Sequence, residues 1–219
     1  MPIANYLLSS FQEQSFYHVI CKSISGKKLF LNDENKRYFL ERYQYFLNDY
    51  LETYAFCLLD NHVHWLIKIK SAAEIVDFLK TMSIERQTIT HKKFLQKECD
   101  FHELIEQQFN RLFIGYSLAL NKKHDVKGHL FHRPFRRICI ADDMHLTQLY
   151  VYIHANPLKH GITKDFFTFK WSSYQAILSN SATNIQREKV LDWFGDREQF
   201  INAHKEMAAF FYEHELGGD

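Results

Sequence analysis

The chain has 219 residues and a formal net charge of +1, from 27 Lys and Arg against 26 Asp and Glu. This length suits one domain with an appended subdomain, and the near-neutral charge excludes a globally basic nucleic-acid-binding protein, so that any such surface must be local. No apolar run is long enough to span a bilayer, and the first residues lack the layout of a signal peptide, so we expect a cytoplasmic protein. The four cysteines are far apart and form no C-x-x-C pair, which indicates free, buried thiols in a reducing compartment.

The first part of the chain alternates strand and helix patterns. "FYHVICKSI" (16–24) alternates apolar and polar residues and predicts a strand. A helix is predicted over 33–49, where apolar residues recur at helical spacing after Asn32 or Asp33 as the N-cap. "ETYAFCLLD" and "VHWLIKIK" predict two more strands, antiparallel to each other because the connection between them is short.

The second part is mostly helical. Helices are predicted over "SAAEIVDFLKTMSIERQTI" and "DFHELIEQQFNRLFIGYSLALNKKH", which together form a helical insertion. "RRICIA" predicts the fourth strand, and "DDMHLTQLYVYIHA" a helix capped by Asp142 that ends before Pro157. Beyond it we expect a short strand over "FFTFKWSSY" and helices over 187–194 and 197–214.

The order β-α-β-β-α-β predicts an α+β fold of the ferredoxin-like type, an antiparallel sheet with helices packed on it. We place the main domain at residues 1–180 and a helical C-terminal extension at residues 181–219.

The stretch "DNHVHWLIKIK" (60–70) puts two histidines at the head of a predicted strand. Because successive side chains of a strand point to opposite faces, His62 and His64 share one face. Two imidazoles on one face can share a metal ion, or they can be ordinary polar residues on a solvated face. The spacing alone does not decide between these interpretations.

The helix that ends "LYVYIHANPLKHGI" carries a second pair of candidates. Tyr152 and Asn156 lie one turn apart on the same helix face. The amide oxygen of Asn156 could hold a cation that binds a phosphate oxygen while the phenol of Tyr152 attacks the phosphorus, and the two histidines would complete a three-ligand site. The other interpretation is a helix with aromatic residues in the core and Asn-Pro as its stop signal.

The stretch "NKKHDVKGHLFHRPFRR" (121–137) concentrates basic residues among aromatic ones. Basic groups bind backbone phosphates, and aromatic rings stack on unpaired bases. Such a run can also be a solvated turn, but its position just before the fourth strand favours a binding role. The candidate DNA-binding residues are Lys122, Lys123, Lys127, Arg133, Arg136, Arg137, Phe131 and Phe135.

The segments "DNHVHWLI", "GHLFHRPFRRI", "YIHANPLKHGI" and "WSSY" occur in this order. With them the chain resembles the single-tyrosine HUH transposase family, and within it the REP-associated tyrosine transposases. The likeness runs from about Tyr17 to Tyr174. It implies a ferredoxin-like, metal-dependent endonuclease and transposase that cleaves and rejoins single-stranded DNA, often beside a hairpin.

The resemblance also implies roles for individual residues. His62 and His64 match the metal-binding histidines, and Asn156 matches the third ligand of a Mg²⁺ or Mn²⁺ ion. Tyr152 matches the nucleophile that forms a 5′-phosphotyrosine intermediate and leaves a free 3′-hydroxyl. Asp60 departs from the many relatives that have Pro there, and we expect it to be a turn residue rather than a partner of a histidine.

Two other functions stay open from the sequence. The chain could be a domesticated protein that binds hairpin DNA without cutting it, or a metal-dependent protein that processes or binds RNA. The complete set of His62, His64, Tyr152 and Asn156 favours the nuclease, with Tyr116 as the next candidate nucleophile. Relatives occur as monomers and as dimers, so a homodimer is left open, and no membrane partner is expected.

Overall fold

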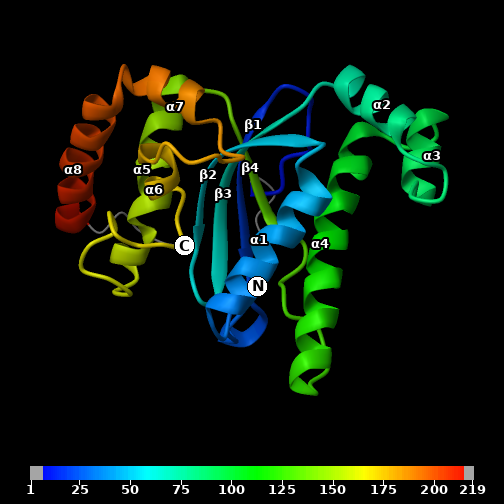
Figure 1. The fold of residues 1–219 in the computed structure, drawn as a ribbon, viewed down its shortest axis with the longest axis horizontal. Helices are drawn as coiled ribbons and strands as arrows, with labels where there is room; N and C mark the ends of the chain where they lie inside the picture. The colour runs from blue at the N-terminus through cyan, green and yellow to red at the C-terminus, as the bar shows by residue number, and fades with distance from the viewer. Residues whose placement is uncertain (1–6, 215–219) are drawn as a thin grey trace.

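The structure is a computed structural model that describes residues 7–214; the side chains at positions 143, 144, 207 and 210–214 are not described. Its centre is a four-stranded sheet with helices on both faces (Figure 1). The strands are β1 (Phe16–Lys22), β2 (Leu51–Leu58), β3 (His62–Ile69) and β4 (Arg136–Ile140). They lie in the order β2-β3-β1-β4 with each neighbouring pair antiparallel, which confirms the ferredoxin-like fold.

The helices form a layer on each side of the sheet. On one side α1 (Asp33–Leu47) packs against α4 (Phe101–His124), and on the other α5 (Asp143–Lys159) packs against β2, β3 and α8 (Arg197–His214) (Figure 1). The shorter helices are α2 (Ala72–Thr81), α3 (Ile89–Leu95), α6 (Tyr174–Leu178) and α7 (Arg187–Phe194), with a 3-10 turn over Ile24–Gly26. None of the described helices combines the length and the apolar character that crossing a membrane requires.

Three predicted elements differ from the structure. The helix predicted over 71–89 ends at Thr81, and a separate helix that was not predicted, α3, begins at Ile89, where Thr88 caps it by accepting a hydrogen bond from the His91 N–H. "FFTFKWSSY" forms turns and a single bridge between Ser172 and Cys57 instead of a strand. The helix expected to end before Pro157 runs on to Lys159, since a proline in the last turn removes only one backbone donor.

The sheet separates two hydrophobic cores. Alternate residues of β3, among them Val63 and Trp65, enter the core under α1 and α4, whereas Leu66 enters the core under α5 and α8. Val190 and Phe200, from the segment expected to be an extension, belong to the second core. Residues 1–6 of the expected main domain and residues 215–219 of the expected C-terminal extension lie outside the described residues.

The cysteines are free, as expected, but only two are buried. Cys21 and Cys57 lie in the interior, Cys99 is half-buried and Cys139 is exposed.

Candidate active site

Three imidazoles lie together on the face of the sheet that α5 covers. His62 and His64 are 4% and 0% exposed, and their ring centroids are 5.0 Å apart. Because Ile20 pairs with His64, the neighbouring strand places His18 diagonally beside it, with Nε2 2.9 Å from Nδ1 of His64. Sequence reasoning missed His18: alternation in β1 places it on one face of its own strand, and only the register with β3 brings it beside His64.

Asn61, the residue before the histidine pair, fixes the orientation of the His62 ring. Nδ1 of His62 is 2.7 Å from Oδ1 of Asn61. An amide oxygen only accepts, so Nδ1 carries the proton and Nε2 keeps a lone pair. Nδ1 of His64 is likewise engaged, by His18, which makes Nε2 the atom of each ring that would bind a metal.

Asp60 is a turn residue, as expected. Its carboxylate accepts hydrogen bonds from Lys28 (2.9 Å) and Lys36 (3.1 Å), and its backbone carbonyl accepts from Leu29. Partial burial would raise the pKa of the carboxyl, but the two ammonium groups outweigh burial and hold that pKa below its usual value. Asn61, not Asp60, is the polar partner of His62.

One face of α5 runs along these histidines. The half-buried ring of Tyr152 lies 5.9 Å from the ring of His64 and 6.2 Å from that of His18. His160 follows α5 directly, and its exposed ring lies 4.8 Å from that of His62. Positions 152, 156 and 160 are each one turn apart, so Asn156 lies between two residues that contact the histidines.

The side chain of Asn156 has a fixed orientation and an unsatisfied oxygen. The residue is fully buried, and Nδ2 donates to the backbone carbonyl of Tyr152 (2.9 Å). Among the described residues nothing donates to Oδ1, and an orphaned buried acceptor costs about 1–3 kcal/mol. An amide oxygen with no donor beside two imidazoles is a donor set that fits a divalent cation.

No group of three or more His, Cys, Asp or Glu residues suited to a metal occurs in the described part of the chain. A three-ligand site at this position therefore depends on the amide of Asn156.

The other polar side chains of α5 attach the helix to its surroundings. The hydroxyl of Tyr150 donates to the backbone carbonyl of Tyr54 (2.9 Å). His154 lies between Nε2 of His204 (3.0 Å) and Oγ of Ser173 (2.7 Å), and burial lowers its pKa well below the usual value. These contacts hold α5 on β2 and α8, and they leave the position of Tyr152 well defined.

The alternative nucleophile Tyr116 has a structural role. Its side chain is 1% exposed, its hydroxyl donates to the backbone carbonyl of Leu29 (2.6 Å), and burial raises its pKa. A phenol in this position cannot reach a phosphate.

Three of the residues predicted to bind DNA lie in the interior, and the prediction is wrong for them. Phe131 and Phe135 are each 3% exposed and pack on Phe113, with centroids 4.7 and 5.4 Å away, so neither offers a face to a base. Arg137 is 6% exposed, forms an ion pair with Glu106 (3.0 Å) and donates to the Ser9 carbonyl. The charge of Arg137 is therefore paired within the protein.

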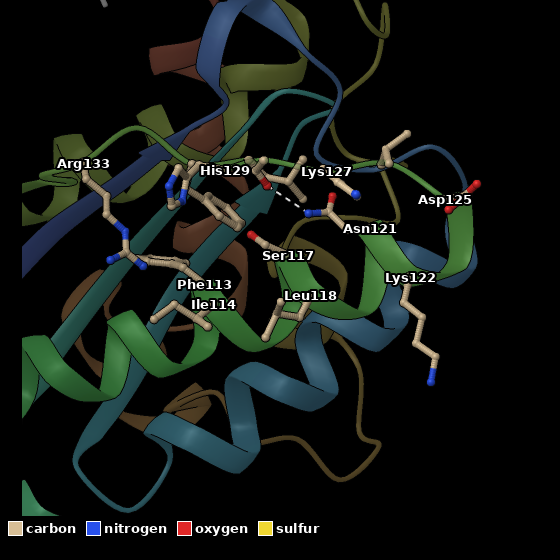
Figure 2. A pocket seen from close by; sticks show the side chains of 14 residues that line it. Phe113, Ile114, Ser117, Leu118, Asn121, Lys122, Asp125, Lys127, His129 and Arg133 are labelled. Atoms are coloured by element: carbon tan, nitrogen blue, oxygen red, sulfur yellow. Dashed lines mark hydrogen bonds between the residues drawn. The ribbon is translucent and has the colours of Figure 1, made fainter.

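The remaining basic residues are accessible to different degrees. A groove of about 680 Å³ runs between the end of α4 and the loop that follows, with Lys127, His129 and Arg133 on the loop side; Lys122 extends away from it (Figure 2). Lys123 is exposed but paired with Glu34 (2.8 Å). Arg136 is half-buried and pairs with Ile20 in the same row as His64, which puts it on the α5 face of the sheet.

No protein-family model matches the chain. Over 156 residues it is 28% identical to a protein of Haemophilus influenzae named "Putative REP-associated tyrosine transposase", a match covering 66% of this chain and 75% of that protein. The fold is similar to the solved structure of a REP-associated tyrosine transposase bound to a REP hairpin, with a TM-score of 0.54 and 12% identity over 79% of this chain and 87% of that one. The sequence match and the shared fold confirm the resemblance that the motifs indicated.

Proposed function

Because the chain is similar to the REP-associated tyrosine transposases in sequence and fold, we propose that it is a metal-dependent endonuclease and transposase that cleaves and rejoins single-stranded DNA beside a hairpin. One observation carries this proposal. The half-buried phenol of Tyr152 lies against the ring of His64, and the buried, donor-free oxygen of Asn156 lies one turn further along the same helix face. A nucleophile and three ligand atoms on one strand and one helix are what phosphoryl transfer to a tyrosine needs.

The proposed metal ligands are Nε2 of His62, Nε2 of His64 and Oδ1 of Asn156. A bound Mg²⁺ or Mn²⁺ ion would polarise a phosphate oxygen and stabilise the charge that develops on it. Asn61 and His18 would fix the two imidazole rings, and the Tyr152 carbonyl would fix the amide, so that these groups are oriented in advance.

Tyr152 supplies the attacking atom. Its phenol oxygen forms a bond to the phosphorus while the bond from phosphorus to the 3′-oxygen breaks. The phenol gives up its proton and the departing 3′-oxygen takes one up, which leaves a free 3′-hydroxyl and a 5′-phosphotyrosine. Attack by a 3′-hydroxyl on that phosphotyrosine reverses the exchange, so rejoining needs no external energy source.

The substrate approaches from the edge where the site is accessible. His62 and His64 are buried, whereas Lys159 and His160 are exposed and Tyr152 is partly so. The ammonium of Lys159 lies 5.2 Å from the centre of the Tyr152 ring and would meet a phosphate that arrives there.

Hairpin DNA is the partner that the likeness supports. The related solved structure contains a bound REP hairpin. For this chain we assign contacts with the phosphates of the hairpin to the exposed Lys122, Lys123, Lys127 and Arg133. We assign to Arg136 a contact with the single DNA strand that reaches the site.

The replacement Tyr152→Phe tests the nucleophile. We expect it to abolish covalent attachment to a labelled single-stranded hairpin oligonucleotide in Mn²⁺, because the attacking oxygen is gone, and to leave hairpin binding unchanged. The readouts are denaturing electrophoresis for the adduct and a mobility shift for binding.

Tyr45→Phe is the matched control, since Tyr45 is 55% exposed on α1, on the other side of the sheet, and this variant keeps the adduct. An adduct that persists in Tyr152→Phe contradicts the assignment of the nucleophile. A wild-type protein that shifts the hairpin and never yields product is a non-cleaving binder.

A further inference from the structure

A second pocket, of about 500 Å³, lies on the same face of the sheet as the candidate active site. It is formed where β1, β2 and β3 meet two helices, namely α7 and the start of α5. Its lining includes Phe16, Lys68, Leu146, Lys189, Asp192 and Trp193.

The pocket lies on the same face as the proposed site, toward the end of the sheet that is farther from His62. Phe16 pairs with Lys68 across β1 and β3, and two residues further along β1 is His18, on the same face and about 7 Å away. Leu146 precedes Tyr152 by six residues, about 9 Å along α5. A strand of DNA whose phosphate lies at Tyr152 and that runs along this face toward the start of α5 reaches this pocket.

The pocket combines an aromatic wall with a few polar groups. The half-buried ring of Trp193 stacks on Tyr54 (centroids 4.8 Å apart, 4° between planes) and meets Phe16 edge-on at 5.5 Å. The ammonium of Lys68 lies 5.6 Å from the centre of the Phe16 ring, and Asp192 is exposed. Such a lining suits a flat heterocycle with amino groups at its edge.

The balance of charge limits how many phosphates could bind there. Lys189 is hydrogen-bonded to both carboxylate oxygens of Glu52, at 2.7 and 2.9 Å, which offsets its charge. Lys68 is then the main attraction for phosphate, and it can serve a single one.

We propose that this pocket holds one nucleobase of the single-stranded DNA that runs from the cleaved phosphate toward the start of α5. The base stacks against the aromatic wall, Asp192 accepts a hydrogen bond from an exocyclic amino group, and Lys68 meets the adjoining phosphate. The C-terminal segment thereby acquires a role, since α7 supplies Lys189, Asp192 and Trp193. The inference rests on the proposed function, and it assigns base preference to a site that the catalytic residues do not form.

Tryptophan fluorescence tests the pocket directly. Trp65 and Trp171 are 0% and 9% exposed, so a base that stacks in the pocket quenches mainly Trp193. The full chain, carrying Tyr152→Phe to prevent turnover, is titrated with a DNA hairpin that has single-stranded tails and with the same hairpin without tails. We expect quenching with the tailed hairpin alone, and its loss in Trp193→Phe, which keeps an aromatic ring on Tyr54.

An abasic scan of the tails supplies the second measurement. One abasic position should weaken binding about tenfold in the protein with Trp193, the scale of one lost stacked base, and should have no further effect in Trp193→Ala. Asp192→Ala should change which base is preferred there, whereas Asp77→Ala, an exposed carboxylate of α2 removed as the matched control, should not. Circular dichroism checks that each variant is folded.

The outcomes separate the two proposals. Hairpin binding without tail-dependent quenching, quenching that persists in Trp193→Phe, or the absence of a sensitive tail position overturns the pocket and leaves the nuclease standing. A protein that binds neither hairpin nor tail overturns both.

Discussion

The orientation of the two imidazoles is set by polar side chains from the residue before β3 and from β1. Asn61 holds Nδ1 of His62, and His18 holds Nδ1 of His64. A ring that is fixed before a metal arrives loses little conformational entropy on binding, and its basicity at Nε2 is raised. The residues beside the ligands are therefore expected to matter for metal affinity although they touch no metal.

We predict that Asn61→Ala weakens Mn²⁺ binding about tenfold to a hundredfold, because His62 loses the acceptor that fixes its tautomer. Isothermal titration calorimetry of the full chain measures the effect. Asn61 is exposed, so the melting temperature should change little.

Asn184→Ala serves as the control for this variant. Asn184 is exposed and directly precedes Ile185, which bridges to Thr53 at the opposite end of the sheet from His62. Equal affinities for Mn²⁺ in the wild type and Asn61→Ala would show that the hydrogen bond does not tune the ligand.

Some of the site could be predicted from short-range spacing. His62 and His64 share a face of a strand, and Tyr152 and Asn156 share a face of a helix, whatever the rest of the chain does. His18 could not be predicted, because its contact depends on the register between β1 and β3, 46 residues apart along the chain. Spacing within one element is local information, whereas register is not.

At the scale of elements, the segment from the end of α4 to β4 serves two purposes. Phe131 and Phe135 are buried in the core under α1 and α4, where Phe131 also borders the groove. Lys127 and Arg133 line the same groove from the loop side (Figure 2). A pattern of basic and aromatic residues looks the same whether the rings face a nucleic acid or the core. This is why the sequence predicted the basic part of the surface but misplaced the rings.

Substitutions in this segment should separate folding from binding. Phe135→Ala should lower the free energy of unfolding by about 3–5 kcal/mol, because it leaves a cavity among packed rings. Arg133→Ala should change that free energy by no more than about 0.5 kcal/mol, yet it should weaken hairpin binding and make binding less dependent on salt.

Urea denaturation and binding titrations at two salt concentrations measure the two effects. If Arg133→Ala binds the hairpin as tightly as the wild type at both salt concentrations, the groove is not a DNA contact.

Element boundaries were predicted least well where tertiary contacts decide them. In the sequence, the capping box at Thr88 can be recognised only if the preceding helix is known to end at Thr81. The segment around Trp171 is apolar enough for a strand, but its backbone meets β2 through the Trp171 carbonyl and the bridge at Ser172. Local propensity cannot reveal such an arrangement.

At the scale of the whole molecule, a buried polar network joins the C-terminal helix to α5. Ser173, His154 and His204 form a chain of hydrogen bonds that ends at the Phe200 carbonyl. Burial lowers the pKa of His204 to about 4, so the network is built for neutral imidazoles.

We predict that the protein loses stability as the pH falls from about 6.5 to about 4. In the unfolded chain His204 gains a proton near its usual pKa of about 6.5, whereas in the folded protein it stays neutral until about pH 4. The unfolded state therefore binds more protons in this interval, and stability falls with pH by up to about 3 kcal/mol from this group. Urea denaturation at pH 7.5, 6, 5 and 4.5 measures the slope.

The variant His204→Phe isolates the contribution of this histidine. It should be less stable at pH 7.5, because His154 loses its partner at Nδ1, but its stability should depend less on pH between 6.5 and 4. A slope equal to that of the wild type would assign the acid sensitivity to other groups.

The attachment of α5 on both of its sides has a consequence for how the reaction could be organised. The helix is tied to β2 by Tyr150 and to α8 by His154, and it lays Tyr152 over histidines of its own sheet. Each polypeptide thus brings together the proposed attacking oxygen and the proposed metal ligands by itself, in cis. On the proposed assignment, a single copy holds a full set of reacting groups, and pairing with another copy would add a second catalytic unit instead of completing the first.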